Sequence, residues 1–121
     1  MERLAKEFNR FVFEKAPEQR AEMVYCETLK SWILLRFCGK NPIADATGVS
    51  TDEELALVFL DAVAFHTCEL PEFQGKKISK QLEMIQQQIS LYSELLSEYI
   101  DITDELISNV CADVIKCVYG D

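Results

Sequence analysis

Apolar residues recur every three or four positions along most of the chain, which is the spacing of helices that bury one face. The repeat predicts a first helix over residues 3–15, with apolar positions at Leu4, Phe8, Phe11 and Val12. A second helix is expected to begin at Pro17, because proline at the first helical position gives up no hydrogen bond, and to end at Gly39, which suits a left-handed cap. Within it, the stretch 32–35 is apolar all round and is predicted to be the most buried part of the fold.

The middle of the chain is predicted to be a loop followed by a buried helix. Residues 39–50 contain an Asn-Pro pair and Gly48, which interrupt regular structure. Ser50 and Glu53 have the spacing of a capping box, in which the serine accepts a backbone hydrogen bond and the glutamate reaches back. The helix expected over 51–67 is almost entirely apolar after Glu54.

The last third of the chain carries the most regular pattern. After a second loop over 69–77, steps of three and four predict a long helix with apolar or aromatic positions at Ile78, Leu82, Ile85, Ile89, Tyr92, Leu95 or Leu96, and Tyr99. Asp101 and Thr103 are candidate caps for a final helix over 102–118, which Gly120 is expected to end. No sustained alternation of polar and apolar residues suggests strands. We therefore predict an all-α fold, a single domain over 1–121 built as a compact bundle of about five helices, orthogonal or up-down.

The composition agrees with a folded domain and adds an uneven charge. Of 121 residues, 49% are hydrophobic, and only four glycines and three prolines are present, which favours a few long helices. The net charge is −9. Residues 1–40 carry 8 basic against 6 acidic side chains, residues 41–77 carry 2 against 7, and residues 78–121 carry 2 against 8. The negative charge therefore lies after residue 40.

Such a field repels nucleic acids and anionic membrane surfaces and attracts basic proteins. No stretch is long and apolar enough to span a bilayer, and the charged N-terminal residues do not have the pattern of a signal peptide. The five cysteines, Cys26, Cys38, Cys68, Cys111 and Cys117, include no Cys-x-x-Cys pair. We interpret them as reduced, mostly buried thiols of a cytoplasmic protein.

The sequence contains no motif typical of catalysis. We expect that the protein is not an enzyme and that it binds neither a metal nor a cofactor. His66 is the only histidine, too few for a helical di-iron site, and no set of three zinc ligands surrounds it. It is interpreted as a histidine at the C-terminal end of a helix, where the dipole favours it. No Walker loop, dinucleotide fingerprint or nucleophile elbow occurs.

One segment imitates a DNA-binding motif. Residues 43–50 resemble the turn of a helix-turn-helix. The helix that would read DNA, however, begins with Asp52, Glu53 and Glu54 and contains no Arg or Lys up to residue 67. Such a helix cannot donate to guanine or neutralise phosphates, so direct nucleic-acid binding is not predicted.

The remaining candidate is the acidic surface. Glu94 and Glu98 are four residues apart, so their charges repel each other on one helix face unless a partner compensates them. Gln86, Gln87 and Gln88, with Tyr92 and Tyr99, are candidates for a neutral part of the same interface. The ten carboxylates proposed to contact a partner are Asp52, Glu53, Glu54, Glu69, Glu72, Glu94, Glu98, Asp101, Asp104 and Glu105.

These features favour a small acidic inhibitor of the immunity, antitoxin or anti-defence type, which mimics nucleic acid and blocks a basic, nucleic-acid-handling protein by steric and electrostatic occlusion. Two alternatives stay open. The first is a helical adaptor or chaperone-like module that forms a homodimer or binds a partner through an apolar helix face, such as the stripe over 78–99. The second is a small helical enzyme or ligand-binding bundle centred on His66.

Overall fold

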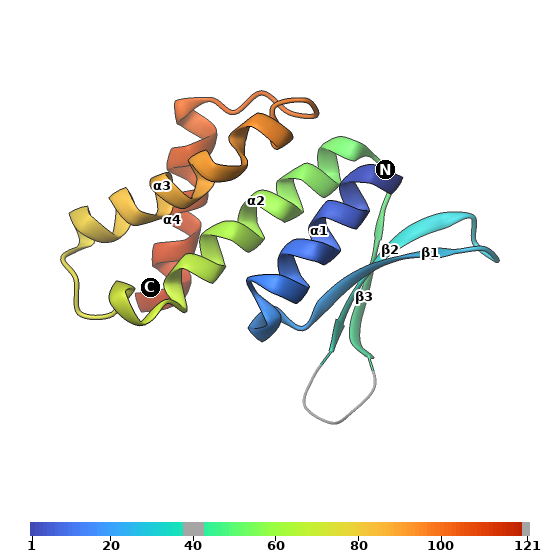
Figure 1. Cartoon of the computed structure of the whole chain (residues 1–121), viewed down its shortest axis with the longest axis horizontal. Helices are drawn as coiled ribbons and strands as arrows, with labels where there is room; N and C mark the ends of the chain where they lie inside the picture. The colour runs from blue at the N-terminus through green and yellow to red at the C-terminus, as the bar shows by residue number, and fades with distance from the viewer. Residues whose placement is uncertain (38–42, 120–121) are drawn as a thin grey trace. The chain divides into compact units, whose positions relative to one another are not determined.

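The structure, a computed structural model, describes residues 1–37 and 43–119 (Figure 1). This part of the chain contains four α-helices and a three-stranded antiparallel sheet, so the prediction of an all-α bundle is wrong. The chain divides into two compact units, Met1–Leu55 and Ala56–Asp121. None of the described helices is both long enough and apolar enough to cross a bilayer.

The first unit combines one helix with the sheet. Helix α1 (Glu2–Glu14) and a short 3-10 helix, η1 (Pro17–Gln19), precede three strands that pair in chain order. These strands are β1 (Ala21–Cys26), β2 (Ser31–Phe37) and β3 (Ile43–Val49). The unit ends in the first turn of α2 (Asp52–Cys68), whose remaining residues belong to the second unit.

The helix predicted from Pro17 onward is replaced by a β-hairpin. Pro17 does begin a helical turn, but Arg20 adopts a left-handed conformation (φ 50°) and the chain becomes extended after it. The hairpin turns at 27–30, where Lys30 is also left-handed (φ 51°). In β2 only Leu34 is buried, while Trp32, Ile33 and Leu35 are half-buried. The stretch 32–35 is therefore not the most buried part of the fold, because side chains of a strand alternate between two faces.

The predicted loop over 39–50 contains a strand. Strand β3 pairs with β2 through contacts such as Leu34 with Thr47 and Ile33 with Gly48. Because residues 43–49 are extended, they do not form the turn of a helix-turn-helix. The proposed caps Gly39 and Gly120 lie outside the described residues.

Helix α1 packs against β1 and covers one sheet face (Figure 1). Its predicted apolar face is buried, as are the sheet residues that share a face by register, Met23, Leu34 and Val49. Asn9 joins the helix to the outer edge of β1. Its side-chain amide donates to the Met23 carbonyl (2.9 Å), and its Oδ1 accepts from the Met23 N–H (2.7 Å). The side chain thereby occupies backbone groups that an edge strand would otherwise expose.

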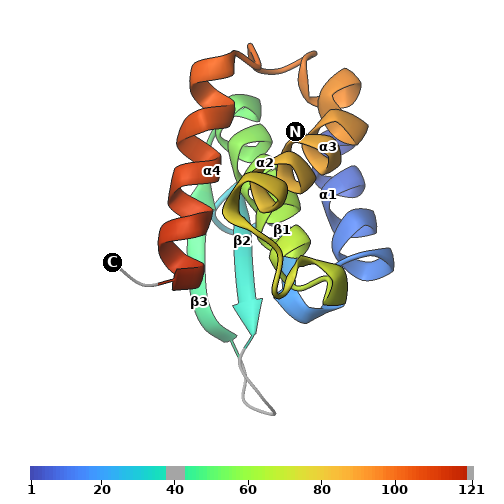
Figure 2. The same cartoon turned by 90° about the vertical axis from the view of Figure 1, so that its left-hand side faces the viewer.

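The second unit is helical, and its helices match the predicted ranges closely. It contains most of α2, the 3-10 helix η2 (Pro71–Phe73), α3 (Ile78–Leu96) and α4 (Asp104–Tyr119). Figure 2 shows α3 and α4 running in opposite directions on either side of their connecting turn. Of the stripe predicted over 78–99, the residues Ile85, Ile89 and Leu96 are buried in the core, whereas Ile78 is exposed and the remaining positions are half-buried.

A buried glutamine of α3 connects η2 to the C-terminal end of α4. Gln81 is 2% exposed, and its amide nitrogen donates to the carbonyl of Phe73 (3.1 Å). Its Oε1 accepts from the hydroxyl of Tyr119 (2.6 Å). Both hydrogen bonds are required because an unsatisfied buried amide is costly, and together they fix the end of α4 beside the start of α3.

Candidate protein-binding surface

The ten predicted contact carboxylates lie in three separate places. The first place is the start of α2, where two of the three carboxylates form contacts within the protein. Asp52 forms an ion pair with the N-terminal amino group (2.6 Å). The capping box is shifted by one residue from the predicted pair: Thr51 Oγ1 accepts from the Glu54 N–H, and the Glu54 carboxylate accepts from the Ser50 N–H, both at 3.1 Å. Glu53 is exposed.

The second place follows α2. Glu69 lies just beyond the helix and Glu72 lies in η2, and both are exposed. Three lysines follow within the next eight residues, Lys76, Lys77 and Lys80. This part of the chain is therefore mixed in charge and gives no continuous negative segment.

The third place is the segment that turns from α3 into α4, residues 94–105, here named the α3–α4 corner. It contains five exposed carboxylates: Glu94, Glu98, Asp101, Asp104 and Glu105. No Lys or Arg occurs between Lys80 and Lys116, so the corner has no basic residue near it in sequence. The corner is the strongest concentration of negative charge among the predicted contacts.

The helix dipoles favour only some of the carboxylates in the α3–α4 corner. Asp104 and Glu105 lie in the first turn of α4, where the dipole favours negative charge, and Thr103 caps that helix by accepting from the Leu106 N–H (3.1 Å). Glu94 lies instead in the last turn of α3, and Glu98 lies in the turn that follows. Negative charge at a helix C-terminus opposes the dipole, so these two carboxylates are placed against the local field.

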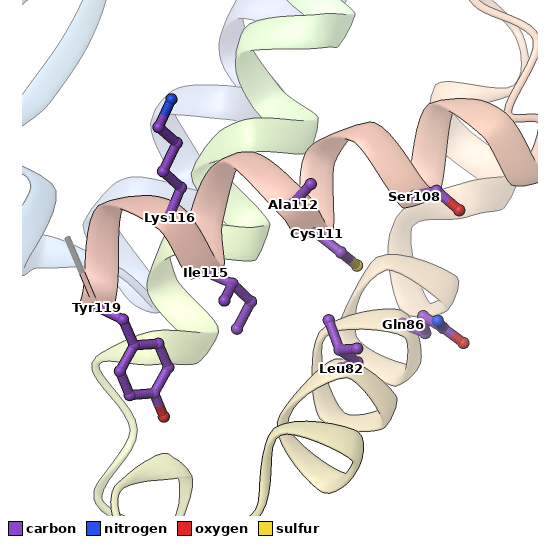
Figure 3. A pocket seen from close by; sticks show the side chains of 8 residues that line it. All are labelled: Leu82, Gln86, Ser108, Cys111, Ala112, Ile115, Lys116 and Tyr119. Atoms are coloured by element: carbon purple, nitrogen blue, oxygen red, sulfur yellow. The ribbon is translucent and has the colours of Figure 1, made fainter. Parts of the chain in front are cut away.

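An apolar groove lies between α3 and α4 in the same unit (Figure 3). Its volume is about 530 Å³, and it is open to solvent. In Figure 3, Cys111, Ile115 and Tyr119 point from α4 towards Leu82 and Gln86 on α3, whereas the Lys116 side chain extends away from α3. The sequence did not reveal this groove, because it depends on the apposition of residues about thirty positions apart.

The aromatic and amide candidates are only partly available to a partner. Tyr92 is half-buried and packs against Phe59, with ring centroids 5.6 Å apart. Tyr99 and Gln88 are half-buried, whereas Gln86 and Gln87 are exposed. Of this group, only Gln86 lines the groove.

Two of the described thiols, those of Cys68 and Cys111, are buried. Burial, with smaller contributions from Glu69 and the neighbouring cysteines, raises the pKa of the Cys68 thiol from 9.0 to about 11. Burial also raises the pKa of Cys111. Both thiols are therefore protonated near neutral pH and are poor nucleophiles. His66 lies in the last turn of α2, and the described residues contain no cluster of three or more His, Cys, Asp or Glu suited to a metal ion.

A second surface is the sheet face opposite α1, here named the open sheet face. Val24, Ile33 and Leu35 share it by register and are all half-buried. Gly48 lies on it beside Ile33, and a Cβ added there meets nothing within 4 Å. Apolar side chains on both faces of one sheet are typical of a sheet that is covered on both sides.

Comparisons with protein families, with curated proteins and with solved structures give no match. The function must therefore be argued from the geometry and charge of the chain.

Proposed function

We propose that the protein binds and occludes a basic protein partner through the α3–α4 corner, in the manner of an inhibitor or immunity-type protein. The observation that carries this proposal is the set of five exposed carboxylates over residues 94–105, with no basic residue between Lys80 and Lys116. A basic surface that normally holds nucleic acid is the expected target, because carboxylates can pair with the arginines and lysines that bind phosphates. The proposal includes no catalysis and places the protein in the cytoplasm.

Glu94 gives the proposal its main physical support. Its position in the C-terminal turn of α3 lowers the stability of the free protein by about a few tenths of a kcal/mol, because the helix dipole opposes negative charge there. Cations from a partner would reverse that effect in the complex. Neutralising Glu94 is therefore expected to raise stability and weaken binding together.

The test compares two variants that remove equal charge from the full chain. In one variant, Glu94→Gln, Glu98→Gln and Asp101→Asn neutralise the corner. In the other, Glu14→Gln, Glu22→Gln and Glu27→Gln neutralise three exposed carboxylates of the first unit. Each immobilised variant is exposed to host extract, and the captured proteins are identified at about 0.1 M and about 1 M salt, where the Debye length falls from about 10 Å to about 3 Å.

The expected result is a basic partner that is captured by the wild type and the control variant, is lost from the corner variant, and is released by high salt. A partner retained equally by the corner variant, or held equally well at both salt concentrations, would overturn the proposal. Urea denaturation of both variants checks that lost capture does not come from unfolding.

A second candidate function is supported by the open sheet face: an adaptor that self-associates or binds a partner through an apolar surface. The apolar stripe over 78–99 is not proposed as this surface, because its residues Ile85, Ile89 and Leu96 are buried. Gly48→Gln provides a clean test, since the added side chain enters open space and removes a glycine from a strand. We expect the variant to fold at least as stably as the wild type and to lose any salt-independent dimer seen by sedimentation velocity. A wild type that stays monomeric at high concentration removes the self-association form of this candidate.

A further inference from the structure

We propose that the groove between α3 and α4 receives an amphipathic helix of the partner, with the basic end of that helix beside the α3–α4 corner. This inference rests on the proposed function and specifies the chemistry of the partner. Its starting point is the apolar surface of Leu82, Ala112, Ile115 and Tyr119, which the second unit leaves open to solvent beside the buried Cys111.

The groove leads directly to the corner. On α4, Ser108 lines the groove and follows Asp104 by four residues and Glu105 by three, so these side chains share one helix face. On α3, successive steps of four residues connect Gln86, which lines the groove, through Ser90 to Glu94. The corner end of the groove is therefore flanked by carboxylates from both helices.

The opposite end of the groove has different chemistry. Lys116 and Tyr119 lie there, and the Tyr119 hydroxyl is already engaged by Gln81. A bound segment thus meets negative charge at the corner end and apolar surface along the middle, and no carboxylate of the described residues lines the opposite end. This gradient selects a ligand whose positive charges are gathered at one end, and it fixes the direction in which the ligand lies.

The dimensions and the walls favour a helix over an extended peptide. From Ser108 to Tyr119, α4 rises about 17 Å at 1.5 Å per residue, which matches about three helical turns of a ligand. The walls are the sides of two helices, whose backbone N–H and C=O groups are already paired within each helix. An added strand would find no backbone partner there, whereas apolar side chains at positions i, i+4 and i+7 of a helix would fit the groove.

A partner other than this chain is favoured by charge. A second copy would bring its own carboxylates towards the corner, and its segment 81–115 contains no Lys or Arg. Its helix α1 carries three basic and three acidic side chains, and the apolar face of that helix is buried against its own sheet. The occupant is therefore a positively charged helix from a different protein.

The experiment uses three synthetic helical peptides of about fourteen residues as probes, each measured by fluorescence anisotropy on the full chain. The first peptide has leucines on one face and three lysines at one end. The second has the same composition with the leucines dispersed around the helix. The third keeps the leucine face and replaces the lysines with glutamines.

Two matched tryptophan variants locate the binding site. Ala112→Trp fills the groove, whereas Asn109→Trp adds the same bulk to an exposed position of α4 that does not line it. Both replaced side chains are exposed, so neither change disturbs the core. We expect the first peptide to bind the wild type and Asn109→Trp equally, and to bind Ala112→Trp about tenfold more weakly or worse, because its apolar anchors are displaced. The dispersed and neutral peptides are each expected to bind at least about tenfold more weakly than the first.

The outcomes separate the groove from the corner. If the dispersed peptide binds as well as the first and Ala112→Trp has no effect, while neutralising the corner weakens both, the groove inference is overturned and the proposed function stands. If Ala112→Trp abolishes binding and neutralising the corner changes nothing, the proposed function fails and the groove remains an apolar site. Failure of the first peptide to bind, or a dimer of the chain that Ala112→Trp dissociates, overturns the inference.

Discussion

Replacing Asn9 with alanine tests the packing of helix α1 on the sheet, because this arrangement and an all-helical one predict opposite changes in the free energy of unfolding. If the chain formed helices over 3–15 and 17–38, Asn9 would have no strand edge to bind. Its replacement by the better helix former would then stabilise the protein by about 0.6 kcal/mol. In the structure the same change removes both hydrogen bonds to Met23, so it is expected to destabilise.

The magnitude follows from the two backbone groups that lose their partner. Leaving a partly buried N–H and C=O unsatisfied costs about 1–3 kcal/mol each, and the lower end applies here because water can partly replace the side chain. A loss of about 2–4 kcal/mol, reduced by the gain of about 0.6 kcal/mol in helix propensity, leaves a net destabilisation of about 1.4–3.4 kcal/mol.

Urea denaturation gives the free energy of unfolding, and hydrogen exchange at the Met23 amide gives a local readout. The control is Arg10→Ala on the same helix, which removes an exposed ion pair with Glu7 (3.6 Å) and is expected to change stability by less than about 0.5 kcal/mol. We expect Asn9→Ala to accelerate exchange at Met23 and Arg10→Ala to leave it unchanged. A stabilising Asn9→Ala with unaltered exchange would refute the pairing of α1 with the edge of β1.

Three further predictions follow from contacts in the structure. Thr51→Ala should lower the free energy of unfolding by about 1 kcal/mol in urea denaturation, whereas Ser50→Ala, at the predicted but incorrect cap, should change it little. Tyr119→Phe should destabilise by about 1 kcal/mol in the same assay, because Gln81 loses a buried hydrogen-bond donor, and an unchanged midpoint would contradict that bond. Because the folded-state pKa of the Cys68 thiol is raised from 9.0 to about 11, its contribution to stability is complete below pH 9 and is lost as the pH rises through 11. Mass-spectrometric mapping of iodoacetamide labelling at pH 8 should accordingly show the exposed Cys117 modified well before Cys68.

Helices α1 and α3 could be predicted from the sequence because each carries a single apolar face. The pattern of Leu4, Phe8 and Val12 marks α1, and that of Ile85, Ile89 and Leu96 marks α3. Both faces of β2 carry apolar residues, so Trp32 to Leu35 form one continuous run, which periodicity alone cannot distinguish from a buried helix. Residues 27–30, which form the turn of the hairpin, include three polar side chains and the exposed Leu29, so they gave only a weak signal against a continuous helix.

Strand β3 was missed for a different reason. Its β-branched residues are interrupted by Ala44, Asp45, Ala46 and Gly48, which are residue types uncommon in strands, so the segment resembles a loop when read alone. They form a strand because β2 supplies the pairing partner. The same contrast between local sequence and tertiary contacts applies to the candidate site. The corner carboxylates could be identified from the charge of the sequence, but the groove beside them depends on how α3 and α4 pack.

Carboxylates at the start of a helix stabilise that helix, whereas carboxylates at its end do not, so the helix dipoles distinguish carboxylates with a structural role from candidates for binding. Asp52 and Glu54 begin α2 and are held by local contacts, and Asp104 begins α4, so stability accounts for all three. Glu94 lies in the last turn of α3, where the dipole opposes its charge. Because the helix dipole does not account for negative charge at that end, the proposed partner is expected to place a positive charge beside Glu94.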